Sequence, residues 1–180
     1  MINTRWITPV GGFRGVYYVS DPEERQRRFF RMNSFGILIA TLNRVLGDNW
    51  YFGRITAISL SGLMHQPVST YYVINQKFSR SFESKIFGKV VLVKASAKMA
   101  GACGIIERKY GNKTYRICSL ERNIADYIYL YVHGHSEGGY VTNLLMNYPP
   151  DKAKVEDIII KCYPRNSAIK MRSFFRKVAL

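Results

Sequence analysis

Residues 119–126 read SLERNIAD and follow a run in which apolar and charged residues alternate. Ser119 is a suitable N-cap, because its hydroxyl can accept a hydrogen bond from an N–H of the first helical turn. Glu121 then lies near the N-terminus of the helix, where the helix dipole favours an anion. Arg122 and Asp126 are four residues apart, so they lie on one helix face and are expected to pair. The stretch predicts a helix that begins after Ser119.

The flanking residues support this change from strand to helix. Before it, Ile105–Tyr110 and Lys113–Cys118 alternate about Gly111 and predict a β-hairpin. After its start, an apolar stripe at helical spacing extends the helix through Leu120, Ile124, Tyr127, Ile128 and Tyr131.

The N-terminal region predicts a second hairpin and a long helix. Trp6–Val10 and Val16–Val19 flank a glycine-rich turn, which is typical of paired strands. Ser20–Glu24 combines a capping residue, a proline and two acids, so a helix is expected from there to about Leu46, with a bend at Gly36.

The remaining patterns complete an α+β fold: a wing-like N-terminal hairpin and long helix, a small mixed β-sheet with packed helices, and a helical C-terminal tail. A weak boundary near Gly47 divides the chain into regions 1–47 and 48–180. Asp151 and Asn166 are candidate helix caps. The other expected elements are a short helix over 54–62, strands over 68–74 and 90–93, a loop or sheet edge over 77–85, and tail helices over 139–148, 155–163 and 166–178.

Net charge is the strongest bulk signal. The 180 residues carry a formal charge of +15, with the excess in residues 1–31, 75–122 and 152–180. Such a surface attracts polyanions through counterion release. The expected DNA-binding residues are Arg5, Arg14, Arg25, Arg27, Arg28 and Arg31. A second basic surface is expected on the tail, from Lys161, Arg165, Lys170, Arg172, Arg176 and Lys177.

Other bulk features indicate a folded cytoplasmic protein without a membrane segment. The longest apolar run, Phe35–Leu42, is too short to span a bilayer. Cys103, Cys118 and Cys162 are widely spaced and are expected to be reduced structural thiols.

Three segments together resemble the AbiEi family, the antitoxin and autorepressor half of type IV toxin–antitoxin systems. Ala57–Met64, which contains Gly62, is similar to the segment that precedes a strand in that family. Ser119–Asp126 is similar to its "S-x-E-R-T-L-L-D" helix start, and Gly138-Gly139 to the glycine pair before its helical tail. The family-motif residues, expected to be structural, are Gly62, Ser119, Glu121, Arg122, Asp126, Gly138 and Gly139.

The resemblance implies a non-catalytic protein that needs no cofactor or metal. It implies operator DNA as one partner, and a nucleotidyltransferase-like toxin, counteracted without a stable complex, as another. The family begins with a winged helix-turn-helix. Because only fourteen residues precede Gly15, a whole three-helix head cannot fit before it, and we expect the DNA-reading helix to be absent, truncated or replaced. The resemblance then implies a partial winged-helix-like region over 1–47 and an AbiEi-like antitoxin domain with a helical tail over 48–180.

Two alternatives remain open from the residues themselves. One is a nucleic-acid-binding accessory protein without a toxin partner. The other is a metal-dependent nuclease, because Glu107 and Lys109 form an E-x-K triplet, with Asp48 or Glu83 as the second carboxylate. His133 and His135 form only a weak metal pattern, and a loop after the tyrosine-rich helix explains them better.

Overall fold

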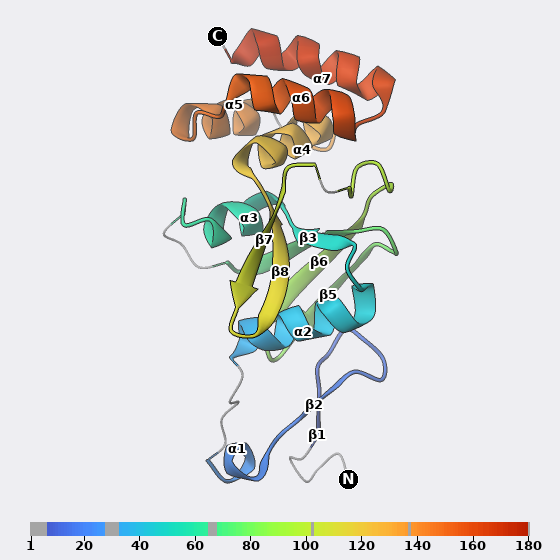
Figure 1. Ribbon diagram of the computed structural model, residues 1–180, viewed down its shortest axis with the longest axis vertical. Coiled ribbons are helices and arrows are strands. Elements are labelled where there is room, and N and C mark those ends of the chain that lie inside the picture. Colours follow the sequence, from blue (N-terminus) through green and yellow to red (C-terminus); the bar gives the residue numbers. More distant parts are fainter. Residues whose placement is uncertain (1–6, 28–32, 65–67, 102, 137, 180) are drawn as a thin grey trace.

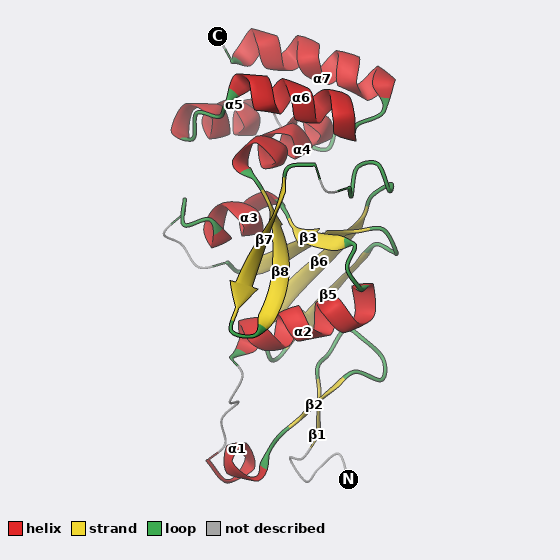
Figure 2. Ribbon diagram, in the orientation of Figure 1, coloured by secondary structure: helices red, strands yellow, loops and turns green. Residues whose placement is uncertain are grey.

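The computed structural model describes residues 7–27, 33–64, 68–101, 103–136 and 138–179. In chain order its strands are β1 (Ile7–Pro9), β2 (Tyr17–Val19), β3 (Trp50–Phe52), β4 (Thr70–Asn75), β5 (Arg80–Ser84), β6 (Gly88–Lys94), β7 (Ile105–Tyr110) and β8 (Lys113–Cys118). Its helices are α1 (Pro22–Arg27), α2 (Ser34–Leu46), α3 (Arg54–Leu60), α4 (Leu120–Val132), α5 (Gly138–Asn147), α6 (Lys152–Cys162) and α7 (Arg165–Val178). The predicted α+β class is confirmed (Figure 2).

A mixed sheet forms the centre of the molecule, with strand order β5-β6-β4-β3-β8-β7. The pairs β4–β6 and β3–β8 are parallel, and the other neighbours are antiparallel. The hairpin predicted about Gly111 is β7–β8, and the N-terminal hairpin is the separate pair β1–β2. The segment expected to be a loop or a sheet edge contains the edge strand β5.

The two faces of the sheet are covered by different helices. On one face, Leu38 and Leu42 of α2 share a buried cluster with Phe52 and Leu92. On the other face, Ala57 of α3 packs with neighbouring strand residues, because successive side chains of a strand point to opposite sides. The first cluster joins residues on both sides of the expected boundary near Gly47, and the division into two regions itself stays a prediction.

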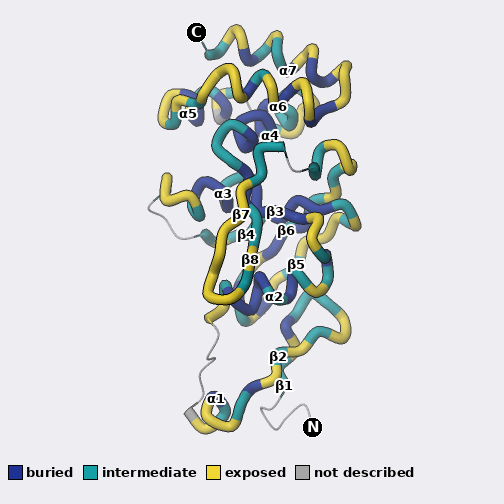
Figure 3. The backbone as a smooth tube through the Cα atoms, in the orientation of Figure 1, coloured by how far each residue is buried: buried dark blue, intermediate teal, exposed yellow. Residues whose placement is uncertain are grey.

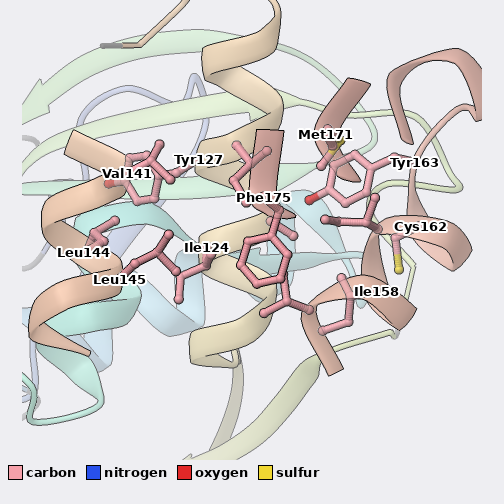
Figure 4. Close-up of a cluster of buried hydrophobic side chains, with 14 of the residues drawn as sticks. Ile124, Tyr127, Val141, Leu144, Leu145, Ile158, Cys162, Tyr163, Met171 and Phe175 are labelled. Carbon is pink, nitrogen blue, oxygen red and sulfur yellow. The ribbon is translucent and has the colours of Figure 1, made fainter. Parts of the chain in front are cut away.

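The four C-terminal helices form their own core at one end of the sheet (Figure 1). Ile124 of α4, Val141 of α5, Ile158 of α6 and Phe175 of α7 are buried together (Figure 4). The β1–β2 hairpin and α1 lie at the opposite end, beyond α2 (Figure 1). Exposed residues predominate along β7 and in α1 (Figure 3).

The prediction of one helix from Ser20 to Leu46 is wrong. Asn33 has an extended backbone, with ψ 165°, and its side chain caps α2 by accepting a hydrogen bond from the Gly36 N–H at 2.9 Å. Gly36 therefore lies in a first helical turn and not at a bend. The asparagine starts a new helix because its side chain satisfies an N–H that a continuous helix would bond internally.

The predicted cap at Asn166 is also wrong. Helix α7 follows Pro164, which makes no side-chain cap hydrogen bond, and Asn166 is already helical. Proline has a fixed φ and favours the start of a helix, so it sets this boundary. The other predicted cap is confirmed, because the Asp151 carboxylate accepts hydrogen bonds from the N–H groups of Ala153 and Lys154.

Candidate nucleic-acid interface

The hairpin β1–β2 and helix α1, residues 7–27, form a unit that we call the N-terminal arm. Asp21 caps α1, because its Oδ1 accepts from the Glu24 N–H at 2.8 Å, and Glu24 Oε2 accepts from the Asp21 N–H at 2.9 Å. This reciprocal pair is a capping box. The Tyr18 hydroxyl of β2 donates to the other oxygen of the buried Glu24 carboxylate. The helix is therefore fixed to the hairpin.

The turn of the arm packs against the edge of the central sheet. Phe13 meets Phe82 of β5 edge-to-face, with ring centroids 4.9 Å apart. The Ser84 hydroxyl donates to the Val10 carbonyl at 2.5 Å. Gly12 has φ +73°, and a Cβ there would overlap the Phe82 ring. Only glycine allows this close approach at a left-handed φ.

One side of the arm presents arginine and apolar side chains to solvent. Arg14 is exposed in the turn. On β2, Tyr17 and Val19 are 48% and 68% exposed, whereas Tyr18 between them faces α1. A two-stranded ribbon of this kind fits the DNA major groove, arginine binds phosphate, and tyrosine can stack on a base.

The structure places three of the six predicted DNA-binding residues on the arm: Arg14 in the turn, and Arg25 and Arg27 in α1. The other three, Arg5, Arg28 and Arg31, lie outside the described residues. The arginine cluster was expected on a long helix packed near a wing. Its described members, Arg25 and Arg27, belong instead to a short helix attached to the hairpin itself.

The second predicted basic surface is partly neutralised inside the tail. Arg172 and Arg176 of α7 both bind Glu156 of α6, with N–O distances of 3.2 and 2.8 Å in their ion pairs. The hydrogen bond from Arg176 is the main cause that lowers the pKa of Glu156 to about 2. Lys161 pairs with Asp157 on its own helix at 2.8 Å. Arg172 and Arg176 therefore join α7 to α6, whereas Lys161 lies on the surface of α6.

Arg165, Lys170 and Lys177 differ from those three cations. All are exposed, and none forms an ion pair with a residue that the structure describes. They remain candidates for the second basic surface, at the opposite end of the molecule from the arm (Figure 1).

The Arg122–Asp126 pair predicted from the sequence is confirmed, and it is buried. Arg122 is 0% exposed, and its Nε donates to Asp126 Oδ1 at 3.1 Å. Its Nη2 donates to the Tyr51 hydroxyl at 3.1 Å, and its Nη1 to the Cys103 carbonyl at 3.2 Å. The Tyr163 hydroxyl donates to Asp126. This network connects the sheet with α4 and the α6–α7 turn.

The electrostatics of this network are those of a structural ion pair. Burial lowers the pKa of Arg122, but the opposing effect of Asp126 and the neighbouring phenols is larger, so the net shift is upward. Burial is also the main cause that raises the pKa of Tyr51 and of Tyr163. The guanidinium therefore stays charged and both phenols stay protonated as hydrogen-bond donors. Neither phenol is activated as a base.

The other family-motif residues also have local structural roles. The Ser119 hydroxyl accepts from the Arg122 N–H at 3.2 Å, as predicted for the N-cap, and Glu121 lies in the first turn of α4. Gly62, at φ +74°, ends α3 in a Schellman motif. Gly138 lies so close to the Tyr131 ring that a Cβ would come within 2.9 Å, whereas Gly139 has open space around it.

The fold brings together some of the residues on which the nuclease alternative depends. Asp48 and Glu107 line the same cavity, of about 320 Å³, between α2 and the diverging strands β3 and β8. Arg116 also lines it and lies opposite Glu107 on the neighbouring strand. Lys109 is exposed on β7, and Glu83 lies on β5 at the far edge of the sheet. Asp48, one of the two candidates for the second carboxylate, thus lines the same cavity as Glu107, and the cation of Arg116 lies there as well.

The predicted loop after the tyrosine-rich helix is confirmed. His133 is the C-cap of α4, and Gly134 follows at φ +74°. The His133 ring is 3.0 Å from the Ser167 hydroxyl and packs on Tyr129. Among the described residues, no three His, Cys, Asp or Glu side chains form a group that could hold a metal ion.

Several residues of the Arg122 network and of the arm were not predicted from the sequence. Tyr51 and Tyr163 complete the Arg122 network from 71 and 41 residues away in sequence, and no local pattern relates them to it. Tyr17 was predicted only as a strand residue. Alternation along Tyr17–Val19 already indicated that Tyr17 and Val19 share a face, but which face is exposed depends on where α1 docks.

Comparisons with known proteins leave the chain unassigned. No protein-family model matches it, and no curated protein matches it. Within the described residues, none of the helices has both the length and the apolar character needed to cross a bilayer.

Proposed function

We propose that this protein is a non-catalytic nucleic-acid-binding regulator that contacts DNA through its N-terminal arm. The main support is that the arm exposes Tyr17 and Val19 on β2 and Arg14 in the turn of the hairpin. The formal charge of +15 supplies long-range attraction to a polyanion. Arg25 and Arg27 in α1 add cations to the same unit.

The resemblance at Ser119–Asp126, Ala57–Met64 and Gly138-Gly139 extends this proposal to an antitoxin and autorepressor of a type IV toxin–antitoxin system, acting in the cytoplasm. Its further partner is then a nucleotidyltransferase-like toxin. Co-expression with the product of the neighbouring gene tests this part. Rescue of growth supports the antitoxin, whereas DNA binding without rescue favours the accessory protein that has no toxin partner.

The salt dependence of DNA binding tests the arm. Arg14, Arg25 and Arg27 are replaced together by alanine, and the dissociation constant for duplex DNA is measured between low and physiological salt. We expect weaker binding and a shallower plot of log Kd against log salt, by about one unit for each phosphate that the arm no longer neutralises.

A matched control separates a local interface from bulk charge. The control variant replaces Arg108, Lys109 and Lys152 by alanine, which removes the same charge from exposed positions that belong neither to the arm nor to the second basic surface. It is expected to keep the wild-type salt slope. Equal weakening in the two variants would show that the arm is not the interface.

The second candidate, a metal-dependent nuclease, is favoured only by the shared cavity of Asp48 and Glu107. Such a site needs several oxygen ligands around a divalent cation. Plasmid DNA incubated with Mg²⁺ or Mn²⁺ tests it. Cleavage by the wild-type protein that is lost in Glu107→Gln would support the nuclease function and contradict the proposed regulator.

A further inference from the structure

A second cavity, of about 370 Å³, lies between the sheet and α4, and no residue of the arm lines it. Its floor is a row of three side chains on adjacent strands, because Tyr51 lies opposite Ile74 and Ile74 lies opposite Val93. Its roof includes Asp126 and Tyr129, which lie on one face of α4. The volume lies within the range of small-molecule sites, roughly 300–1,000 Å³.

The position of this cavity in the topology is one that open sheets use for ligands. The parallel strands β4 and β6 both end there, and Lys94, Ala95 and Ser96 continue along its wall. Ligands of sheets with parallel strands bind beyond the carboxyl ends of those strands. The cavity thus coincides with a favoured location for ligands in the fold.

The charges that line the cavity favour an anion. The Asp126 carboxylate is 14% exposed, and its charge is balanced by the buried Arg122. Arg54 also lines the cavity, and it forms no ion pair with a described residue. Lys94 follows Val93 on β6, so its side chain points to the opposite face of the sheet. The lining therefore combines one unbalanced cation with one carboxylate that can accept a hydrogen bond.

Arg54 is held in place at a conformational cost. It has φ +54°, the one left-handed non-glycine residue among those described. Its carbonyl accepts from the Asn123 side chain at 3.0 Å, and its guanidinium lies 5.0 Å from the Tyr72 ring centroid. Glycine would adopt this φ without strain, so the backbone alone does not explain an arginine here. Packing on Tyr72 and a ligand contact in the cavity are both roles that need the arginine side chain.

We propose that the cavity binds a small aromatic anion of the nucleoside monophosphate class. The base lies between the floor of Ile74 and Val93 and the roof of α4, an amino group of the base donates to Asp126, and the phosphate is bound by Arg54. Apolar walls, a carboxylate acceptor and an arginine match the three parts of such a ligand. This site is independent of DNA binding by the arm.

Isothermal titration of the full chain with AMP, GMP, CMP and UMP, each separately, tests the proposal. At least one is expected to bind with a Kd below about 1 mM. Arg54→Gly keeps the left-handed backbone while removing the guanidinium, and it is expected to raise that Kd at least fivefold. Lys89→Ala, on β6 but outside the lining, is the matched control and is expected to stay within twofold.

Three results would overturn the proposal: no binding of any of the four nucleotides, inorganic phosphate binding as tightly as the best of them, or a rise in Kd below fivefold in Arg54→Gly. Circular dichroism confirms that each variant is folded. DNA binding by Arg54→Gly is measured in parallel and is expected to match wild type, so failure of this site and failure of the arm interface give different results.

Discussion

Arg122 shows how much a single residue depends on its surroundings. The spacing of four residues identified its partner, Asp126, because helix geometry brings such side chains together. Spacing says nothing about burial, and the pair lies in the interior among two phenols and two backbone carbonyls. A buried pair is costly to break, because removal of one partner leaves an uncompensated charge.

Replacement of this arginine by an apolar residue is therefore a severe change. We expect Arg122→Met to lower the free energy of unfolding by about 3–5 kcal/mol, since Asp126 loses its cation and buried carbonyls lose their donors. Urea denaturation measures the decrease. The double variant Arg122→Met/Asp126→Leu also removes the carboxylate that the single variant leaves unpaired, and it is expected to be more stable than the single variant. A single variant within about 1 kcal/mol of wild type would contradict this account.

At the scale of elements, two contacts attach the ends of the chain: the packing of the arm turn on β5, and the binding of α7 to α6 through Glu156. Gly12 permits the first by closely approaching Phe82. Glu156 provides the second by accepting from Arg172 and Arg176. The first contact joins elements that are far apart in the sequence, and the second joins two consecutive helices.

Gly12→Ala tests the first contact. We expect a decrease of about 1–3 kcal/mol in unfolding free energy, from a strained φ and from overlap with the Phe82 ring. Gly15→Ala is the matched control, because Gly15 also has a left-handed φ, +77°, but open space around it. If both variants are destabilised equally, the ring contact does not position the arm.

Glu156→Gln tests the second contact through pH. The folded-state pKa of Glu156 is lowered to about 2, so the carboxylate stabilises the fold above its unfolded pKa, and this stability is lost as pH falls from there towards 2. The variant is expected to be less stable than wild type at pH 7, with a difference that shrinks steadily below about pH 4.5. Midpoints of urea denaturation at pH 7, 5, 4 and 3 measure the difference in stability between the variant and wild type. A difference that does not change with pH would refute the lowered pKa of Glu156.

For the whole molecule, the arm and the helical tail lie at opposite ends of the central sheet (Figure 1). No residue of the arm is a member of the buried cluster of the tail. Changes at sites that are far apart and share no partner have additive effects on stability. The two ends should therefore act independently.

A double-mutant cycle tests this independence. The stability decreases of Gly12→Ala and Glu156→Gln are expected to add within about 0.5 kcal/mol in the combined variant. Urea denaturation of the four proteins at pH 7 gives the coupling energy. A larger coupling would mean that the sheet transmits a structural change between its ends.

The sequence alone determined the features that depend on near neighbours. The β7–β8 hairpin, the Ser119 cap and the tail helices followed from alternation, helical spacing and capping, which act within a few residues. The Arg122–Asp126 pair followed for the same reason. The α+β class then resulted from the sum of these local patterns.

The features that depend on long-range contacts were decided only by the tertiary structure. Trp50–Phe52 is too short to identify as a strand, yet it lies inside the sheet because β4 and β8 pair on either side of it. Arg172 and Arg176 looked like free basic surface, but Glu156 on another helix binds them. The cavity beside Arg54 exists only where β3, β4, β6 and α4 meet. Local patterns carry no information about such partners, because burial and ion pairing depend on which distant residues the fold brings into contact.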